Sequence, residues 1–307
     1  MTLISSLNLI QTALELGLIC SLTVLALFLS YSMLGVCDLS TDGCFTLGAA
    51  AGAVVVLAGH PWLSLPAAML AGCLSGLVTA VLQTRMGVNS LLAGIVVNTG
   101  LYSVNIAVMG GSSLLNMNKA TTVFTMAKDL LKGSALEGMW KLIPAALFAL
   151  AAAGLLSLFL RTRLGLAIRA TGDNLAMVKS SSIDPAFTTT AGLCISNSLT
   201  ALSGCLLAQS QRSVNIDIGS GMLTVALASL LIGGVFFRGR SIPLRVLIML
   251  FGAFVFRLGY TLALRLNMPA FMLRLISSVI VVIAISAPYL HSRMPLIKRR
   301  MELKREA

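Results

Sequence analysis

The sequence predicts an all-α polytopic membrane protein with about eight or nine transmembrane helices, some of them short or discontinuous. Hydrophobic residues make up 57% of the 307 residues, and only 10% are charged. Soluble domains carry about 25% charged residues. The mean hydropathy is +0.96. The apolar residues also form continuous runs of about 20, the length of a membrane-spanning helix, whereas barrel strands alternate over about 10 residues.

The apolar runs predict where the helices lie. They cover residues 9–33, 45–58, 63–84, 90–109, 141–160, 186–209, 222–237, 244–264 and 270–290. The run 45–58 is too short to cross a bilayer alone, because an α-helix rises about 1.5 Å per residue. Together with the polar break before it, this run predicts a discontinuous helix. Residues 1–290 are predicted to form a single transmembrane domain, followed by a basic tail at 291–307.

The formal net charge of +12 at pH 7 could indicate a nucleic-acid-binding protein. Most of the 22 Lys and Arg residues, however, lie between apolar runs or in the tail, as the positive-inside rule expects. We therefore expect the tail to contact anionic membrane lipid, and we expect no nucleic-acid partner. The same rule places residues 161–185 and the C-terminus in the cytoplasm and the loops at 110–140 and 210–221 outside. It leaves the side of the N-terminus open, because that depends on whether 45–58 crosses.

No catalytic or metal-binding pattern is found in the sequence. The six cysteines form no C-x-x-C pair, and most lie in apolar runs, where we expect them to be small packing residues. The two histidines, His60 and His291, lie near predicted membrane interfaces. No glycine is followed by lysine, so the phosphate-binding loop G-x-x-x-x-G-K-[ST] is absent. The sequence therefore predicts a non-catalytic chain that itself binds no ATP and no other cofactor.

Polar residues interrupt the chain just before the short run 45–58. Asp38, Ser40 and Asp42 lie in this break. Backbone that leaves a helix at membrane depth is tolerated where it lines a cavity or is buried in protein. These three residues are therefore candidates for a translocation pathway, and a plain cytoplasmic turn is the alternative.

A second set of candidates follows one helix face. Asn98, Tyr102 and Asn105 are spaced four and three residues apart, which puts their side chains on the same side of a helix. Such a face could line a polar pathway, because polar groups at membrane depth are costly unless they face water or a partner. Hydrogen bonding between helices explains the same pattern equally well.

Asp217 and Arg257 complete the candidate pathway residues. Asp217 precedes the short run 222–237, and the tripeptide at 217–219 (Asp-Ile-Gly) echoes the tripeptide at 38–40 (Asp-Leu-Ser). Interrupted segments in matching positions are typical of inverted repeats with a transport pathway between them, although chance produces such echoes as readily. Arg257 lies within an apolar run. It could pair with an acid, meet a substrate carboxylate, or snorkel to the outer interface.

The polar stretch 161–185 carries the most specific motif. Residues 162–174, TRLGLAIRATGDN, resemble the pattern T-x-x-G-x-a-x-R-A-x-G-x-N of permease subunits in ATP-binding-cassette (ABC) importers of the branched-chain amino acid and ribose class. Segments 37–50 and 224–234 resemble two further landmarks of that class, the first in a subgroup linked to uptake of amino acids such as tryptophan or tyrosine. One departure is the sequence Ser-Ser-Ile at 181–183, where many relatives have Ser-Gly-Ile.

The resemblance implies a permease subunit that forms the translocation pathway for a small polar solute, with an amino acid favoured. It implies a permease dimer, expected to be a homodimer, at a bacterial inner membrane. Its partners would be a cytoplasmic ATPase subunit, which carries ATP and Mg²⁺, and an extracytoplasmic substrate-binding protein. The docking element of this class corresponds to residues 164–179. The residues assigned to ATPase coupling are Arg163, Gly165, Arg169, Gly172, Asp173 and Asn174.

A self-sufficient secondary transporter or channel is the main alternative. It would need ion-coupling carboxylates in the middle of the membrane, and the available acids, Glu15, Asp38, Asp42 and Asp217, lie near predicted helix ends. A membrane scaffold without transport activity would explain the composition but not the polar breaks. The importer permease is therefore the function that the sequence favours.

Overall fold

The computed structural model describes residues 2–133, 137–236 and 241–265, together with five isolated residues between 275 and 286. Within this part, the chain is all-α apart from one sheet of two short strands. Six helices are long and apolar enough to cross a membrane, and two shorter apolar helices accompany them. The predicted all-α architecture is thereby confirmed. The span 270–290 and the tail 291–307 lie outside the described helices, so the count of about eight or nine spans stays a prediction.

The elements follow one another in a simple order. They are α1 (Thr2–Leu27), a π-helical turn (Phe28–Met33), α2 (Thr41–Leu57), α3 (Ser64–Thr84), α4 (Ser90–Val108), β1 (Leu114–Asn116), α5 (Val123–Leu131), a 3₁₀ turn (Glu137–Met139), α6 (Leu142–Phe159), α7 (Arg163–Asp173), α8 (Leu175–Ser180), α9 (Pro185–Gln211), β2 (Ser213–Asn215), α10 (Met222–Phe236) and α11 (Ile242–Arg265). Polar caps begin several helices, since the side chains of Asn89, Thr162 and Asp184 each accept a backbone N–H of the helix that follows.

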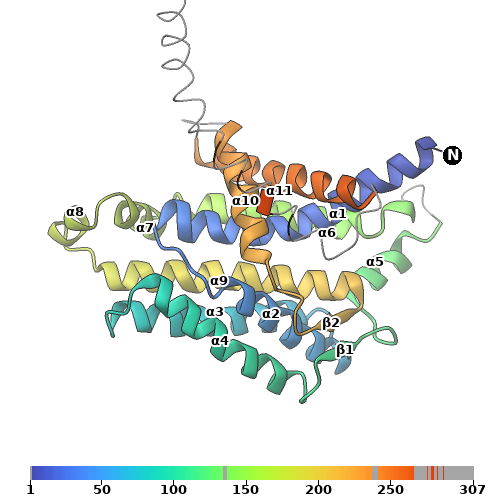
Figure 1. Ribbon diagram of the computed structural model, residues 1–307, viewed down its shortest axis with the longest axis horizontal. Helices are drawn as coiled ribbons and strands as arrows, with labels where there is room; N and C mark the ends of the chain where they lie inside the picture. The colour runs from blue at the N-terminus through green and yellow to red at the C-terminus, as the bar shows by residue number, and fades with distance from the viewer. Residues whose placement is uncertain are drawn as a thin grey trace, which may run out of the picture.

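Helix α9 lies at the centre of the helix bundle. Its largest contacts are with α3 and α2, followed by α1, and Figure 1 shows it running along the long axis between α1 and α3. Every residue from 199 to 210 is buried. Small residues permit this packing, because a Cβ added at Gly48 would collide with the backbone of Ala201, and one added at Gly204 with the carbonyl of Phe45. The backbones of α2 and α9 are therefore in direct contact.

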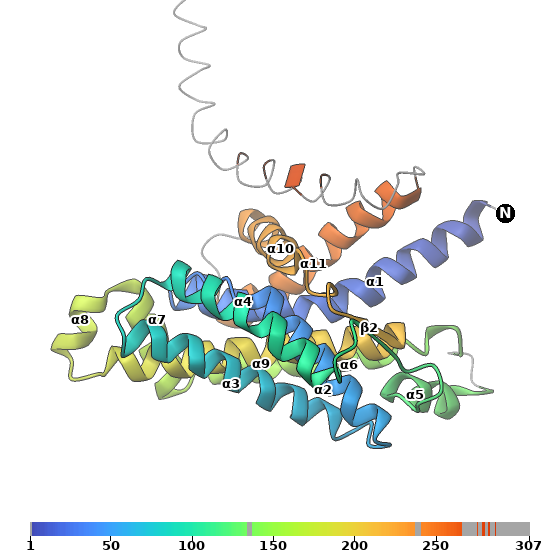
Figure 2. The same cartoon turned by 60° about the horizontal axis from the view of Figure 1, so that its bottom comes forward.

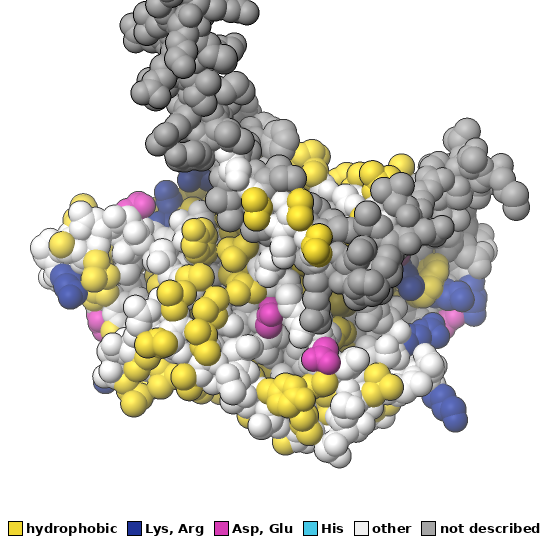
Figure 3. Space-filling view, viewed as in Figure 1, with side chains coloured by type: hydrophobic (Ala, Val, Ile, Leu, Met, Phe, Trp, Pro, Cys, Tyr) yellow, Lys and Arg dark blue, Asp and Glu magenta, His cyan; other side chains and the backbone are white. Residues whose placement is uncertain are grey.

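The bundle has two distinct ends, which Figures 1 and 2 both show. Helices α7 and α8 lie at one end, which we call the α7–α8 end, and β1, β2, α5 and the N-terminus lie at the other, the β end. The two strands pair antiparallel, so the loops at 110–140 and 210–221 share a side, as the charge distribution predicts. On the face in Figure 3, basic side chains gather at the two ends and hydrophobic ones over the middle.

The start of α1 lies at the β end as well. The Gln11 side chain donates a hydrogen bond to the carbonyl of Gly138 (2.6 Å), which lies in the 3₁₀ turn before α6. The N-terminus is thus on the same side as the loops at 110–140 and 210–221. This contact places the N-terminus relative to these two loops, which the sequence leaves open.

Candidate functional site

The first interruption of the bundle lies between α1 and α2. After its π-helical turn the chain leaves the helix, with Gly35 in a left-handed conformation (φ +73°). Asp38 is 1% exposed, and its carboxyl group accepts hydrogen bonds from the Ser40 N–H (2.8 Å), the Ser40 hydroxyl (2.6 Å) and Asn197 Nδ2 (2.8 Å). Because Asn197 lies near the middle of α9, helix α2 begins inside the bundle rather than at its surface.

The second interruption lies between α9 and α10, and it reaches the first. The Asp42 carboxyl group accepts hydrogen bonds from the N–H groups of Gly221 (2.9 Å) and Leu223 (2.7 Å), which are free donors at the start of α10. The Thr46 hydroxyl accepts one from the Gly219 N–H (3.2 Å). The two short helices, α2 and α10, therefore begin at the same place inside the bundle, with Asp42 joining them.

Helix α4 holds the start of α2 from another side. Asn98 Oδ1 accepts a hydrogen bond from the Gly43 N–H (2.7 Å), and Asn105 Nδ2 donates one to the Gly43 carbonyl (3.1 Å). Tyr102, between them, keeps 52% of its surface exposed. Asn105 is buried, and its Oδ1 has no hydrogen-bond partner within the described part of the chain. Hydrogen bonding between helices, one of the two explanations for this face, is therefore present.

Two cavities open where the short helices meet. The smaller, which we call the Tyr102 cavity, has a volume of about 270 Å³. Its lining residues are Asp42, Gly43, Thr46, Asn98, Thr99, Tyr102, Asn105, Ile216, Asp217 and Ser220. The larger, the Arg257 cavity, has a volume of about 600 Å³, and its lining includes Gln211, Ser213, Asn215, Asp217, Ser220, Thr224, Arg257 and Tyr260. Asp217 and Ser220 line both cavities, so the two adjoin.

Arg257 lines the larger cavity from α11 and is half-buried. Its Nη2 donates to the sulfur of Cys20 on α1 (2.8 Å), and its guanidinium lies 5.5 Å from the centre of the Tyr260 ring. Its Nε is buried and has no hydrogen-bond partner in the described residues. Among those residues no carboxylate lies within ion-pair distance of it. Pairing with an acid, one of three explanations for this arginine, is therefore not found there.

The structure divides the predicted pathway residues into two groups. Six of them line the two cavities: Asp42, Asn98, Tyr102, Asn105, Asp217 and Arg257. Asp38 and Ser40 line neither, and their burial (1% and 0% exposed) is incompatible with a surface turn. Sequence reasoning missed Asn197 and Tyr260. Both could have been identified from the sequence, because Asn197 is an amide in the middle of an apolar run and Tyr260 follows Arg257 at helical spacing.

At the α7–α8 end, three residues of the coupling motif have structural roles. A Cβ added at Gly165 would collide with the carbonyl of Phe159, and one added at Gly172 with the carbonyl of Met33. These glycines let α7 pack closely against the end of α6 and against the π-helical turn that follows α1. The Asn174 side chain accepts a backbone N–H in the first turn of α8 and caps that helix.

The other motif residues lie on the surface of the same end. Ile168 and Val178 are buried and attach α7 and α8 to the bundle, while Arg169 is half-buried. The exposed side chains of these helices combine apolar and charged groups: Leu166, Leu175, Met177, Arg163 and Asp173. Exposed apolar groups beside charges are typical of a surface that binds another protein.

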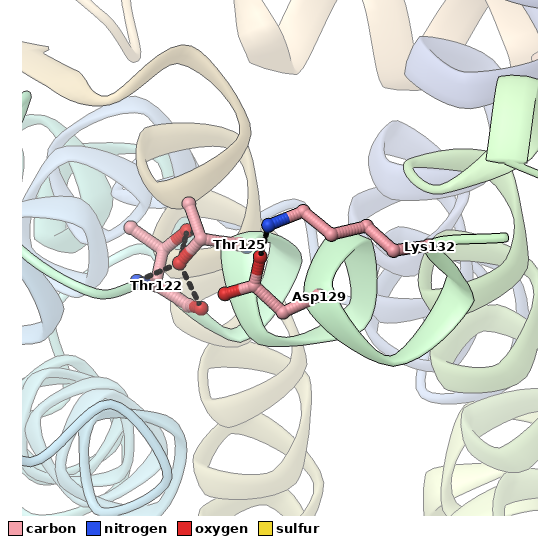
Figure 4. A network of polar contacts seen from close by, with 4 residues as sticks. All are labelled: Thr122, Thr125, Asp129 and Lys132. Atoms are coloured by element: carbon pink, nitrogen blue, oxygen red, sulfur yellow. Dashed lines mark hydrogen bonds and ion pairs between the residues drawn. The ribbon is translucent and has the colours of Figure 1, made fainter.

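Helix α5 covers part of the β end. Figure 4 shows Thr122 and Thr125 capping its start and the ion pair between Lys132 and Asp129 (2.7 Å) further along. The hydrogen bond from Lys132, together with its charge, holds the pKa of the Asp129 carboxyl below its usual range. Gln209 of α9 accepts a hydrogen bond from the backbone N–H at the start of α5 (3.0 Å). Helix α5 is therefore fixed to the bundle by its first turn.

Comparison with known proteins identifies the family. The profile described as "Branched-chain amino acid transport system / permease component" matches residues 9–285. A tyrosine transport system permease protein of Clostridioides difficile (strain R20291) is 33% identical over 267 residues, which are 87% of this chain and 86% of the relative. An uncharacterized protein of Rickettsia prowazekii (strain Madrid E) is 29% identical over 284 residues, 91% of this chain and 98% of that one.

A solved structure shares the fold. PsaBC from Streptococcus pneumoniae in complex with Fab aligns with a TM-score of 0.51 at 15% identity, covering 91% of this chain and 90% of that chain. The family profile covers most of the chain, and the resemblance carried by residues 162–174 is thereby confirmed. The chain belongs to the permease components of branched-chain amino acid transport systems, and it is a non-catalytic, multi-pass membrane subunit of an ABC importer.

Proposed function

We propose that this permease subunit forms the translocation pathway for a free amino acid, with tyrosine as the first candidate. The observation that carries the proposal is the meeting of two interrupted helices at a pair of polar cavities inside an otherwise apolar bundle. Non-helical backbone at such depth fits a solute pathway. The choice of tyrosine rests on the relative from C. difficile, which is a tyrosine transport system permease protein.

The two ends of the bundle suit two different partners. The α7–α8 end would face the cytoplasm and bind the ATPase subunit, which carries ATP and Mg²⁺, through residues 161–185. The β end would face outward and receive the substrate-binding protein. In this orientation the N-terminus is outside and the C-terminus is in the cytoplasm of a bacterial cell whose inner membrane holds the chain. Two copies would form the complete channel, as a homodimer.

Within the α7–α8 end, we assign different tasks to the motif residues. Gly165, Gly172 and Asn174 would shape the docking element, because their contacts are with the chain itself. Arg163, Arg169 and Asp173 would contact the ATPase. The inverted repeat stays a proposal supported by the two short helices, which begin at one place and are preceded by similar tripeptides.

Reconstituted uptake tests this function. The chain, with the ATPase and the binding protein that purify with it, should give ATP-dependent uptake of labelled tyrosine in proteoliposomes. The double variant Arg169→Ala/Asp173→Ala should retain insertion and thermal stability but lose uptake about tenfold or more, as expected when interface contacts worth about 1.4 kcal/mol or more are removed. Arg85→Ala, a basic residue exposed just after α3, is the matched control and should retain uptake.

Two results would contradict the proposal. The first is uptake by the purified chain alone when only an ion gradient is supplied, which would favour a secondary transporter. The second is loss of membrane insertion in the double variant, which would make residues 161–185 a structural segment rather than a coupling segment.

A further inference from the structure

The Arg257 cavity contains a positive charge without a counter-ion among the described residues. The guanidinium of Arg257 has only the Cys20 thiol and the Tyr260 ring as partners there, and its Nε is buried with no partner. A guanidinium at membrane depth normally has an anion beside it, since an unpaired charge there is costly. Because Arg257 lines the cavity, its guanidinium group is placed to meet a carboxylate from outside the chain.

The same cavity contains a negative charge that also has no counter-ion in the described part of the chain. Asp217 is exposed and lines the cavity from the segment before α10. Its backbone is fixed, because its N–H donates to Asn215 Oδ1 (3.2 Å) and its carbonyl accepts from the Ser220 N–H (3.0 Å). Its side-chain carboxyl group has no hydrogen bond or ion pair to any residue that the structure describes. Within the described residues Asp217 and Arg257 are thus both without an ion-pair partner, and they do not neutralise each other, since no nitrogen-to-oxygen distance between them is within 4.0 Å.

From this pair of charges we infer that the Arg257 cavity binds a free amino acid in its zwitterionic form. Arg257 receives the α-carboxylate, and Asp217 receives the α-ammonium group. An anion alone would leave Asp217 unpaired, and a cation alone would leave Arg257 unpaired, whereas a zwitterion satisfies both. The inference rests on the proposed function and deepens it, because it gives the permease a substrate site of its own besides that of the binding protein.

The remaining walls of the cavity fit such a ligand. The volume of about 600 Å³ falls in the range of about 300–1,000 Å³ that is usual for small-molecule sites. Hydroxyl and amide groups of Gln211, Ser213, Asn215 and Thr224 line it. They offer donors and acceptors to the parts of the ligand that the two charges do not hold. Tyr260 lies beside Arg257, where an aromatic ring can contact a ligand side chain as well as the guanidinium.

Competition by analogues tests the site separately from transport. The complex of permease and ATPase subunits in lipid nanodiscs, without the substrate-binding protein and without ATP, is loaded with labelled tyrosine. The competitors are tyramine, which lacks the carboxylate, and 3-(4-hydroxyphenyl)propionate, which lacks the ammonium group. In the wild type each should compete at least about tenfold less well than tyrosine, because each loses one charge-assisted contact.

The two variants should change this preference in opposite ways. Arg257→Gln should lower tyrosine affinity at least about tenfold and bring it close to that of tyramine, while still rejecting the propionate. Asp217→Asn should bring tyrosine close to the propionate, while still rejecting tyramine. The matched controls, Arg85→Gln and Asp129→Asn, change exposed charges that do not line the cavity and should keep the wild-type order. Thermal unfolding of each variant checks that it is folded.

The outcomes separate this inference from the proposed function. The reciprocal pattern supports the site, even if uptake of tyrosine later proves slow. Wild-type preferences in both variants would overturn it, as would an equal loss of all three ligands in folded variants. A wild-type complex that does not bind tyrosine at about 1 mM, the range of a weak site, would also overturn it. Absence of ATP-dependent uptake in a complex that shows the reciprocal pattern would contradict the proposed function alone.

Discussion

The two interruptions of the helix bundle carry the same residue type in opposite environments. Asp38, in the first, is 1% exposed, and its carboxyl group accepts three hydrogen bonds. Asp217, in the second, is exposed on both cavities, and its carboxyl group has no partner within the described residues. The tripeptides at 38–40 and 217–219 therefore occupy similar positions before a short helix, but their acidic side chains make different contacts.

The difference follows from what surrounds each segment. Helix α2 is enclosed by α9, α3 and α4, and most of its residues are buried, so a polar side chain before it needs a partner in the protein. Helix α10 packs mainly on α11 and α1 and touches α2 chiefly near its start. The first interruption thus belongs to the packed core. The second borders the cavities and leaves its acid free for a ligand.

Replacing Asp38 by alanine is expected to have the largest effect on stability. The donors of Ser40 and Asn197 would lose their acceptor inside the protein, and each buried unsatisfied group costs about 1–3 kcal/mol. We expect the free energy of unfolding to fall by about 3 kcal/mol or more, as measured by denaturant titration in detergent micelles. Asp38→Asn, the matched control, keeps one oxygen acceptor and should lose about half as much. An unchanged stability in Asp38→Ala would remove the contrast between the two interruptions.

The elements that depend on local sequence could be predicted. The positions of the apolar helices follow from runs of about 20 hydrophobic residues, because a bilayer demands that length whatever the tertiary contacts. The break before α2 follows from a polar segment beside a short run. The common side of the loops at 110–140 and 210–221 follows from the charge distribution. The motif at 162–174 is also a local sequence feature, and it led to the family.

The roles of individual charged residues could not be predicted, because they are set by residues far away in the sequence. Asp38 is bound by Asn197, which lies 159 positions later, and Arg257 contacts Cys20 across 237 positions. Asp42 was grouped with Asp38 in one polar break, but its carboxyl group caps a helix that begins 180 residues further on. Spacing along one helix shows which side chains share a face, and it does not show what that face meets.

Removing the link between the two interruptions should have an intermediate effect. Asp42→Ala deprives the first turn of α10 of its acceptor, and loss of such a cap costs about 1–2 kcal/mol. We expect faster hydrogen–deuterium exchange of the Leu223 amide, with exchange in α9 unchanged. Asp42→Asn retains one acceptor and should show a smaller increase. If exchange at the start of α10 were the same in Asp42→Ala as in the wild type, the two short helices would not depend on each other through this residue.

Replacing Asp217 by alanine should have the smallest effect on stability. Its carboxyl group has no partner among the described residues, so its removal should change the free energy of unfolding by no more than about 0.5 kcal/mol, as for most surface substitutions. The measurement is the titration used for Asp38→Ala, run in parallel on the same preparation. A loss comparable to that of Asp38→Ala would mean that Asp217 also holds the fold together. A small loss, together with weaker tyrosine binding, would mean that the chain keeps this acid for its ligand.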